Sequence, residues 1–121
     1  MTEYTVSYLL ESFPKAARHL ATGEGDARER VWLAYLAIHH FQPELLPENL
    51  RDDFVWVRRQ LTKRNPERNE VVRGSKVHEE GLIEANLRTM KNRTASKIAE
   101  RIYTIYQKIL GVAFEPREGI R

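Results

Sequence analysis

The pattern of apolar and polar positions predicts amphipathic helices between residues 26 and 110. The clearest stretch, residues 94–110, spaces its apolar side chains three and four positions apart, which makes one stripe along a helix. The opposite side of this stretch is polar and charged. The pattern predicts a helix packed on a core and indicates no chemistry by itself. The stripe consists of Ala95, Ile98, Ala99, Ile102, Ile105, Tyr106 and Ile109.

Helix start signals divide the preceding chain into further helices. Asp26, followed by Glu29 three residues later, forms a capping-box pattern that begins a helix over about 27–41. Because this helix is apolar on all sides, we expect it to be the central and most buried one. Pro47 fits the first turn of a third helix. The apolar stripe of that third helix is Leu50, Phe54, Val57 and Leu61.

A fourth helix is predicted over about 82–90, and a short turn at 92–94 joins it to the last helix as an antiparallel hairpin. Gly111 is expected to end the last helix. Before the fourth helix, the apolar periodicity fails from residue 65 to residue 81, which predicts a long basic loop. Asn86 lies at the edge of the fourth helix's apolar stripe, where a buried amide would hydrogen-bond across the interface and fix the helix register.

The N-terminal segment, residues 4–21, is predicted to be a helix broken at Pro14, with Ser12 placed to cap the restart. The expected fold is therefore all-α: a single-domain, irregular helical bundle of four main helices plus a broken N-terminal helix. Residues 1–111 would form the bundle, and residues 112–121 a C-terminal tail.

Composition excludes several classes of site. The chain has 121 residues and no cysteine, so disulfides, thiol catalysis and thiolate metal sites are ruled out. The longest apolar run, residues 31–38, is too short to span a bilayer. The N-terminus also lacks the charged start of a signal peptide. We therefore expect a cytoplasmic protein that does not contact membranes.

The net charge of +3 conceals an uneven distribution. Residues 1–57 carry five basic and nine acidic side chains, whereas residues 58–121 carry fifteen basic and eight acidic ones. The densest basic stretches are residues 58–76 and 88–108, which we expect to form the basic surface.

The third helix and the loop after it combine a tryptophan with this basic stretch. An aromatic ring beside guanidinium groups can anchor a protein partner or stack a nucleic-acid base. The alternative interpretation is that the tryptophan packs under another helix while the arginines form a solvated face. The candidate partner-binding residues are Trp56, Arg58, Arg59, Lys63, Arg64 and Arg68.

Nothing in the sequence predicts a catalytic residue, a cofactor or a metal site. His39 and His40 are adjacent, so they point about 100° apart on a helix, and the spacings of common helical metal sites do not occur. The adjacent acidic pairs do not converge on one point either. A small helical enzyme would require His19, His39 or His40 to meet carboxylates in a pocket, which sequence alone does not show.

Several phrases occur together in a recognisable order. They are Arg28-Glu29-Arg30-Val31-Trp32, Leu46-Pro47-Glu48, Gly81-Leu82-Ile83-Glu84-Ala85-Asn86-Leu87 and Ala99-Glu100-Arg101-Ile102. In this order the chain resembles a group of small uncharacterised bacterial helical proteins over about residues 16–110. The resemblance implies a bacterial origin and an all-helical fold, and it supplies no catalytic residues. The segment 65–80 departs from that pattern.

The expected function is therefore a non-catalytic interaction module that binds a protein partner or itself, as a homodimer. The alternative is a nucleic-acid-binding accessory protein that uses the basic surface 58–76. That alternative predicts an affinity that falls steeply with salt, because contacts to phosphates release counterions.

Overall fold

The computed structural model describes residues 2–63 and 76–113, with side chains described for residues 2–63 and 81–111. Every element in these ranges is helical, which confirms the all-α fold. In chain order the elements are α1 (Val6–Leu9), α2 (Phe13–Thr22), α3 (Ala27–Ile38), the 3-10 turn η1 (Pro43–Leu45), α4 (Glu48–Thr62), α5 (Lys76–Thr89) and α6 (Asn92–Ala113).

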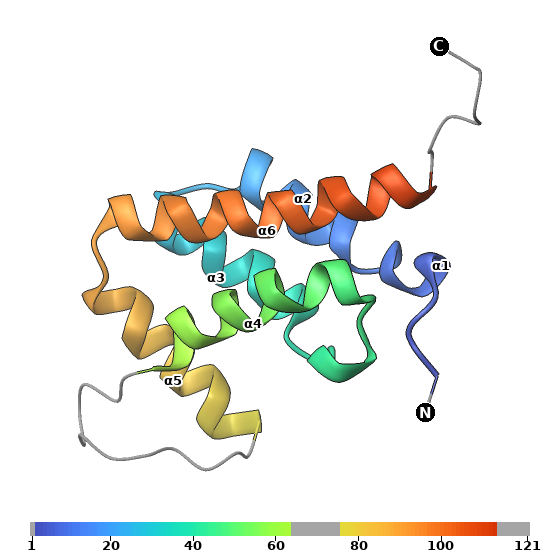
Figure 1. The fold of residues 1–121 in the computed structure, drawn as a ribbon. Coiled ribbons are helices and arrows are strands. Elements are labelled where there is room, and N and C mark those ends of the chain that lie inside the picture. Colours follow the sequence, from blue (N-terminus) through green and yellow to red (C-terminus); the bar gives the residue numbers. More distant parts are fainter. Residues whose placement is uncertain (1, 64–75, 114–121) are drawn as a thin grey trace.

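The longest helix, α6, runs across the bundle and packs against α2, α3 and α4 (Figure 1). α2 and α3 lie against each other, and α5 packs on α3 and α4. The apolar stripes predicted for α4 and α6 face one common core, as their spacing requires. The largest fully buried side chains include Phe13, Tyr35, Phe41, Phe54, Leu61, Ile83, Ile98, Ile102 and Ile105.

The N-terminal helix is broken where predicted. Pro14 lies in the first turn of α2. Ser12 occupies the N-cap position and its carbonyl accepts the backbone N–H of Ala16, but its side chain makes no capping hydrogen bond. The residues before α1 are held on η1 by two hydrogen bonds. The backbone N–H of Tyr4 donates to the Leu45 carbonyl at 2.8 Å, and the Tyr4 hydroxyl accepts the N–H of Gln42 at 3.0 Å.

The start of α3 follows its sequence signal. Asp26 Oδ1 accepts the backbone N–H groups of Arg28 at 3.0 Å and Glu29 at 3.3 Å, which satisfies two of the donors at the helix N-terminus. Immediately before the cap, Gly25 has a φ of 89°, a conformation that favours glycine. The helix ends at Ile38, earlier than the predicted residue 41, with His39 as its C-cap.

Two boundaries in the C-terminal half differ from prediction. α5 begins at Lys76, inside the segment 65–81 expected to be a loop. The sequence did not predict this start because residues 76–80 include three charged side chains and carry no apolar stripe. The other expected loop residues, 65–75, lie outside the described residues. α6 continues past Gly111 to Ala113, since an isolated glycine is tolerated inside a helix. The expected tail beyond it, 114–121, is not described.

The predicted antiparallel hairpin of the last two helices is also wrong. α5 comes before the turn and packs against α3 and α4 instead of lying along α6 (Figure 1). The reason is that Ile83 and Leu87 join the core between those two helices. A short turn limits only the distance between helix ends, and burial decides their angle.

α3 is less buried than its composition predicts. Val31, Ala34, Tyr35 and Ile38 face the core, whereas Leu33 on the outer side is 38 % exposed. The outer side of α3 therefore presents an apolar side chain at the surface of the described part of the molecule.

In the described residues no helix is long and apolar enough to cross a membrane.

Candidate interaction site

Trp56 lies between α4 and α6 rather than on an open surface. Its ring is half-buried against the core, and the guanidinium of Arg101 lies over the ring, 4.3 Å from its centroid. Asp53 holds this arginine, since Asp53 Oδ1 accepts Arg101 Nη1 at 3.3 Å. The second carboxylate oxygen of Asp53 accepts Lys108 Nζ at 2.7 Å. This geometry supports the alternative interpretation that Trp56 packs under another helix.

Arg58 points away from the predicted surface. Its Nε donates to the Tyr35 hydroxyl at 3.0 Å, and its Nη2 donates to the carbonyls of His39 at 2.8 Å and Phe41 at 3.3 Å. The reason is helical geometry, because a residue two positions after Trp56 points about 200° away from it. Arg58 therefore satisfies carbonyl groups at the end of α3.

The structure does not bring the predicted partner-binding residues together as one surface. Arg59 and Lys63 are exposed near the end of α4, and Lys63 Nζ donates to Gln60 Oε1 at 3.0 Å. Arg64 and Arg68 lie outside the described residues. In the described part of the chain, the basic surface after Trp56 thus consists of Arg59 and Lys63.

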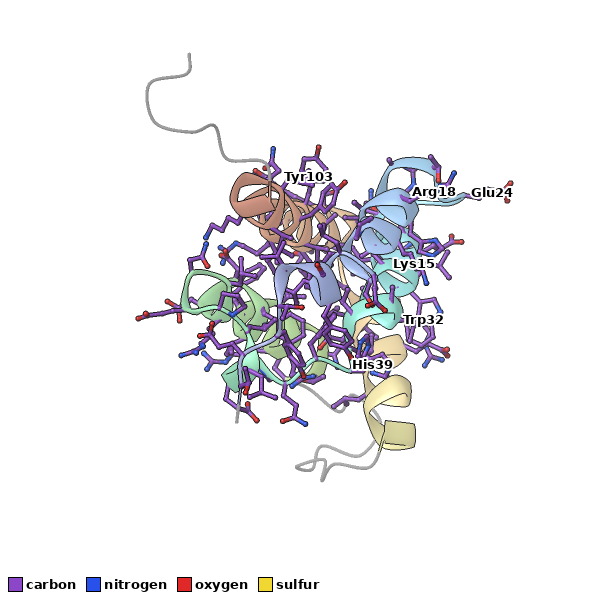
Figure 2. All side chains as sticks on the ribbon, turned by 90° about the vertical axis from the view of Figure 1, so that its right-hand side faces the viewer. Lys15, Arg18, Glu24, Trp32, His39 and Tyr103 are labelled. Carbon is purple, nitrogen blue, oxygen red and sulfur yellow. The ribbon has the colours of Figure 1, made fainter. Side chains whose placement is uncertain are left out.

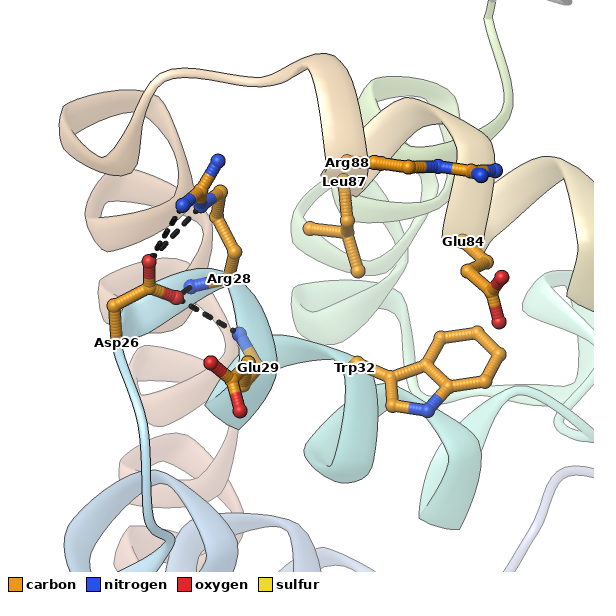
Figure 3. A pocket seen from close by; sticks show the side chains of 7 residues that line it. All are labelled: Asp26, Arg28, Glu29, Trp32, Glu84, Leu87 and Arg88. Atoms are coloured by element: carbon orange, nitrogen blue, oxygen red, sulfur yellow. Dashed lines mark hydrogen bonds and ion pairs between the residues drawn. The ribbon is translucent and has the colours of Figure 1, made fainter.

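A pocket that the sequence did not reveal lies between the start of α3 and the end of α5. It has a volume of about 310 Å³ (Figure 3). Both helices supply charged side chains, and one tryptophan forms part of the wall. The lining residues are Asp26, Arg28, Glu29, Trp32, Glu84, Leu87 and Arg88.

One side of this pocket is a structural clamp. Asp26 Oδ2 accepts Arg28 Nε at 3.0 Å and Nη2 at 2.8 Å, while Arg28 Nη1 reaches the Met90 carbonyl at 3.5 Å. The backbone N–H of Ala27 donates to Asn92 Oδ1 at 3.0 Å. These contacts fix the start of α3 to the turn between α5 and α6.

The same clamp shifts two pKa values. The hydrogen bond from the Arg28 side chain lowers the pKa of Asp26, and the same bond raises the pKa of Arg28. Both groups are therefore charged at neutral pH. Each is already engaged by the other.

The other side of the pocket is formed by Trp32, Leu87 and Glu84. Trp32 is half-buried, and in Figure 3 its indole lies below Leu87 with the Glu84 carboxylate directed toward the ring. Glu29, one turn before Trp32 on α3, is exposed, and in Figure 3 its carboxylate points away from the indole. This side therefore places one carboxylate, that of Glu84, beside an aromatic ring.

Trp32, which lines the pocket, also borders the apolar outer side of α3. Leu33 is exposed and Leu36 is half-buried there. In Figure 2, Trp32 and Lys15 of α2 both extend to the right-hand side of the molecule. Sequence reasoning missed this surface because Trp32 belongs to a run that was assigned wholly to the core. The sequence offered one clue, because residues 31–38 are apolar on every side of the helix. A helix can bury apolar residues on every side only where other elements surround it completely.

The histidines are dispersed. The His39 ring lies 6.3 Å from Tyr35 and the His40 ring 4.2 Å from Phe41, centroid to centroid, while His19 is half-buried on α2. Within the described residues no group of three or more His, Cys, Asp or Glu side chains could hold a metal ion. Asn86 is buried, and its Nδ2 donates to the Leu82 carbonyl of its own helix at 2.8 Å.

Comparisons with protein-family models, with curated proteins and with solved structures found no match to this chain.

Proposed function

We propose that this protein is a non-catalytic interaction module that binds a protein partner or a second copy of itself through the outer side of α3. The observation that supports this proposal is the mismatch between the composition of α3 and its burial. Residues 31–38 of this helix are apolar on every side, yet the fully buried ones, Val31, Ala34, Tyr35 and Ile38, lie on the core side. A contiguous group of apolar side chains at a surface is typical of contact sites.

The outer side of α3 has the composition of an interface centre. Leu33 is exposed there, and the half-buried Trp32 and Leu36 are its neighbours at helical spacing. Tryptophan is enriched among the residues that contribute most to binding, particularly where it lines a pocket. Full burial of a leucine side chain contributes about 1.5–3 kcal/mol, so covering this side would supply substantial binding energy.

A matched pair of variants tests the proposal. Leu33→Gln replaces an apolar side chain on the proposed surface that is 38 % exposed, and Val55→Gln replaces one on α4 that is 39 % exposed. Sedimentation velocity over a range of concentrations measures self-association. Wild-type protein and both variants are immobilised and exposed to the same cell extract. Quantitative mass spectrometry then compares the proteins that each of the three retains.

The expected result is that Leu33→Gln abolishes either the self-association or the retention of a particular protein, while Val55→Gln preserves it. Equal behaviour of all three proteins would overturn the proposal. Binding of a mixed DNA and RNA pool at low salt that disappears as salt rises would instead support the nucleic-acid alternative, whose described cations are Arg59 and Lys63.

A further inference from the structure

The basic stretch 88–108 contributes three free cations at the turn between α5 and α6, at the left-hand end of α6 in Figure 1. Arg101 and Lys108 of this stretch are bound by Asp53, and Arg88 also has a partner. The other three cations are exposed, and none forms a hydrogen bond or an ion pair with another described side chain. No acidic residue lies between positions 88 and 99. We call these three residues the turn cluster: Lys91, Arg93 and Lys97.

The start of α3 holds this turn in place. The backbone N–H of Ala27 donates to Asn92 Oδ1 at 3.0 Å, and Arg28 Nη1 donates to the Met90 carbonyl at 3.5 Å. The Asp26 carboxylate is already paired with Arg28, so this contact adds no net negative charge beside the turn. An anion that approaches the turn therefore meets cations carried by a fixed backbone.

The turn cluster is electrostatically unfavourable for the helix that carries it. Arg93 lies in the first turn of α6, which has no acidic residue, and Lys91 directly precedes the helix. Positive charges at this position oppose the helix dipole. Arg93 and Lys97 are also four positions apart, where like charges repel each other. By contrast, α3 begins with Asp26 and Glu29, as the dipole favours. Departures from such local rules of stability are expected at functional sites, and a bound anion would relieve both repulsions.

The residues around the turn cluster fit phosphate groups better than they fit a protein surface. The other exposed residues of this stretch include Thr89, Asn92 and Ser96, and hydroxyl and amide groups join lysine and arginine in contacts to phosphates. No residue from 88 to 97 is aromatic, and the two apolar ones, Met90 and Ala95, are half-buried and buried. Protein interfaces have apolar and aromatic centres, and single strands bind by stacking on aromatic rings. The backbone of a duplex requires neither.

We propose that the turn cluster binds the phosphodiester backbone of a nucleic-acid duplex without reading its sequence. This surface differs from the outer side of α3, so the inference goes beyond the proposed function. It also differs from the basic surface 58–76 of the nucleic-acid alternative. Because each phosphate contact releases counterions, the affinity should fall as salt rises.

Labelled DNA and RNA duplexes of the same twenty-base-pair sequence are the probes. Fluorescence anisotropy measures their affinity between about 20 and about 200 mM salt. Arg93→Gln with Lys97→Gln should weaken binding at low salt at least about tenfold and reduce the slope of log affinity against log salt by about 2. Lys15→Gln with Arg18→Gln removes the same charge from exposed positions on α2 and should leave the affinity within about twofold.

Thermal unfolding of the free protein separates binding from folding. The variant Arg93→Gln with Lys97→Gln should melt no lower than the wild type, because it removes charges that oppose the helix dipole and repel each other. Weaker binding together with a lower melting temperature would mean that these residues support the fold, and would overturn the proposal.

The remaining outcomes identify the surface and the partner. Equal losses in the α2 control, or a loss confined to Arg59→Gln with Lys63→Gln, would overturn the turn cluster, and the latter would assign binding to α4. A single strand or polyglutamate that binds more tightly than the duplexes, or no binding at low salt, would also overturn it. Leu33→Gln should leave duplex binding unchanged, so failure of the turn cluster would not affect the interaction surface on α3.

Discussion

Arg58 of α4 and Tyr35 of α3 form a hydrogen bond of 3.0 Å that ties the two helices together at the C-terminal end of α3. The same guanidinium also reaches the carbonyls of His39 and Phe41. A single side chain therefore satisfies groups that the end of a helix leaves without an intrahelical partner. The planar fork of arginine allows this, because its donors point in fixed, different directions.

Replacing Arg58 by alanine should destabilise the fold. The carbonyls of His39 and Phe41 would lose their charged donor, so the free energy of unfolding should fall by about 2 kcal/mol. Arg59→Ala, at the next and exposed position, should change it by less than about 0.5 kcal/mol. Urea denaturation followed by circular dichroism measures both, and equal effects would contradict the structural role of Arg58.

The Asp53 carboxylate should contribute more to stability than its neighbour. Asp53 accepts Arg101 and Lys108 from α6 and is largely shielded from solvent, whereas Asp52 is exposed. We expect Asp53→Asn to lower the free energy of unfolding by about 1 kcal/mol, and Asp52→Asn by less than about 0.5 kcal/mol. A double-mutant cycle of Asp53→Asn with Lys108→Met should show a favourable coupling energy. A coupling of zero would mean that the ion pair contributes nothing.

The clamp at the start of α3 should make stability depend on acid pH. The folded-state pKa of Asp26 is lowered, mainly by the Arg28 side chain, from an unfolded-chain value of about 3.9. Its contribution is therefore fully present above the unfolded-state pKa and is lost as pH falls through the lowered folded-state pKa. Asp26→Asn keeps a good N-cap residue but removes the charge.

We expect urea midpoints to fall more between pH 7 and pH 3 for the wild type than for Asp26→Asn. The difference should shrink at high salt, because the pair is exposed and therefore screened. Identical pH profiles would show that the ion pair does not stabilise the folded state.

Two glycine-to-alanine substitutions should change the stability of the fold in opposite directions. Gly25 has a positive φ, and a Cβ there would meet the Glu29 carboxylate, so Gly25→Ala should destabilise by about 1–2 kcal/mol. Gly81 lies inside α5 with open space around its Cα, so Gly81→Ala should stabilise by about 0.5–1 kcal/mol. Thermal unfolding measures both. A stabilising Gly25→Ala would mean that the backbone readily adopts a negative φ there.

Local sequence signals determined much of the fold. The three-four spacing of isoleucines predicted α6 and its buried stripe, and Asp26 predicted the start of α3, because both signals act within one or two helical turns. The start of α5 at Lys76 escaped prediction because its first residues carry charges and no apolar stripe. A helical segment that lacks amphipathic spacing is difficult to predict from a single sequence.

Only the tertiary structure decided which residues form the candidate site. The sequence placed Trp56 and Arg58 on one surface, but contacts from α6 and α3 draw each of them into the structure. Conversely, Trp32 lies in a run that reads as core, and its partial exposure follows from where α2, α5 and α6 pack on α3. The pocket joins Glu29 on α3 to Glu84 on α5, residues far apart in the chain. Helical periodicity fixes the directions of side chains around one axis, and only packing determines which of those directions meets another helix and which meets solvent.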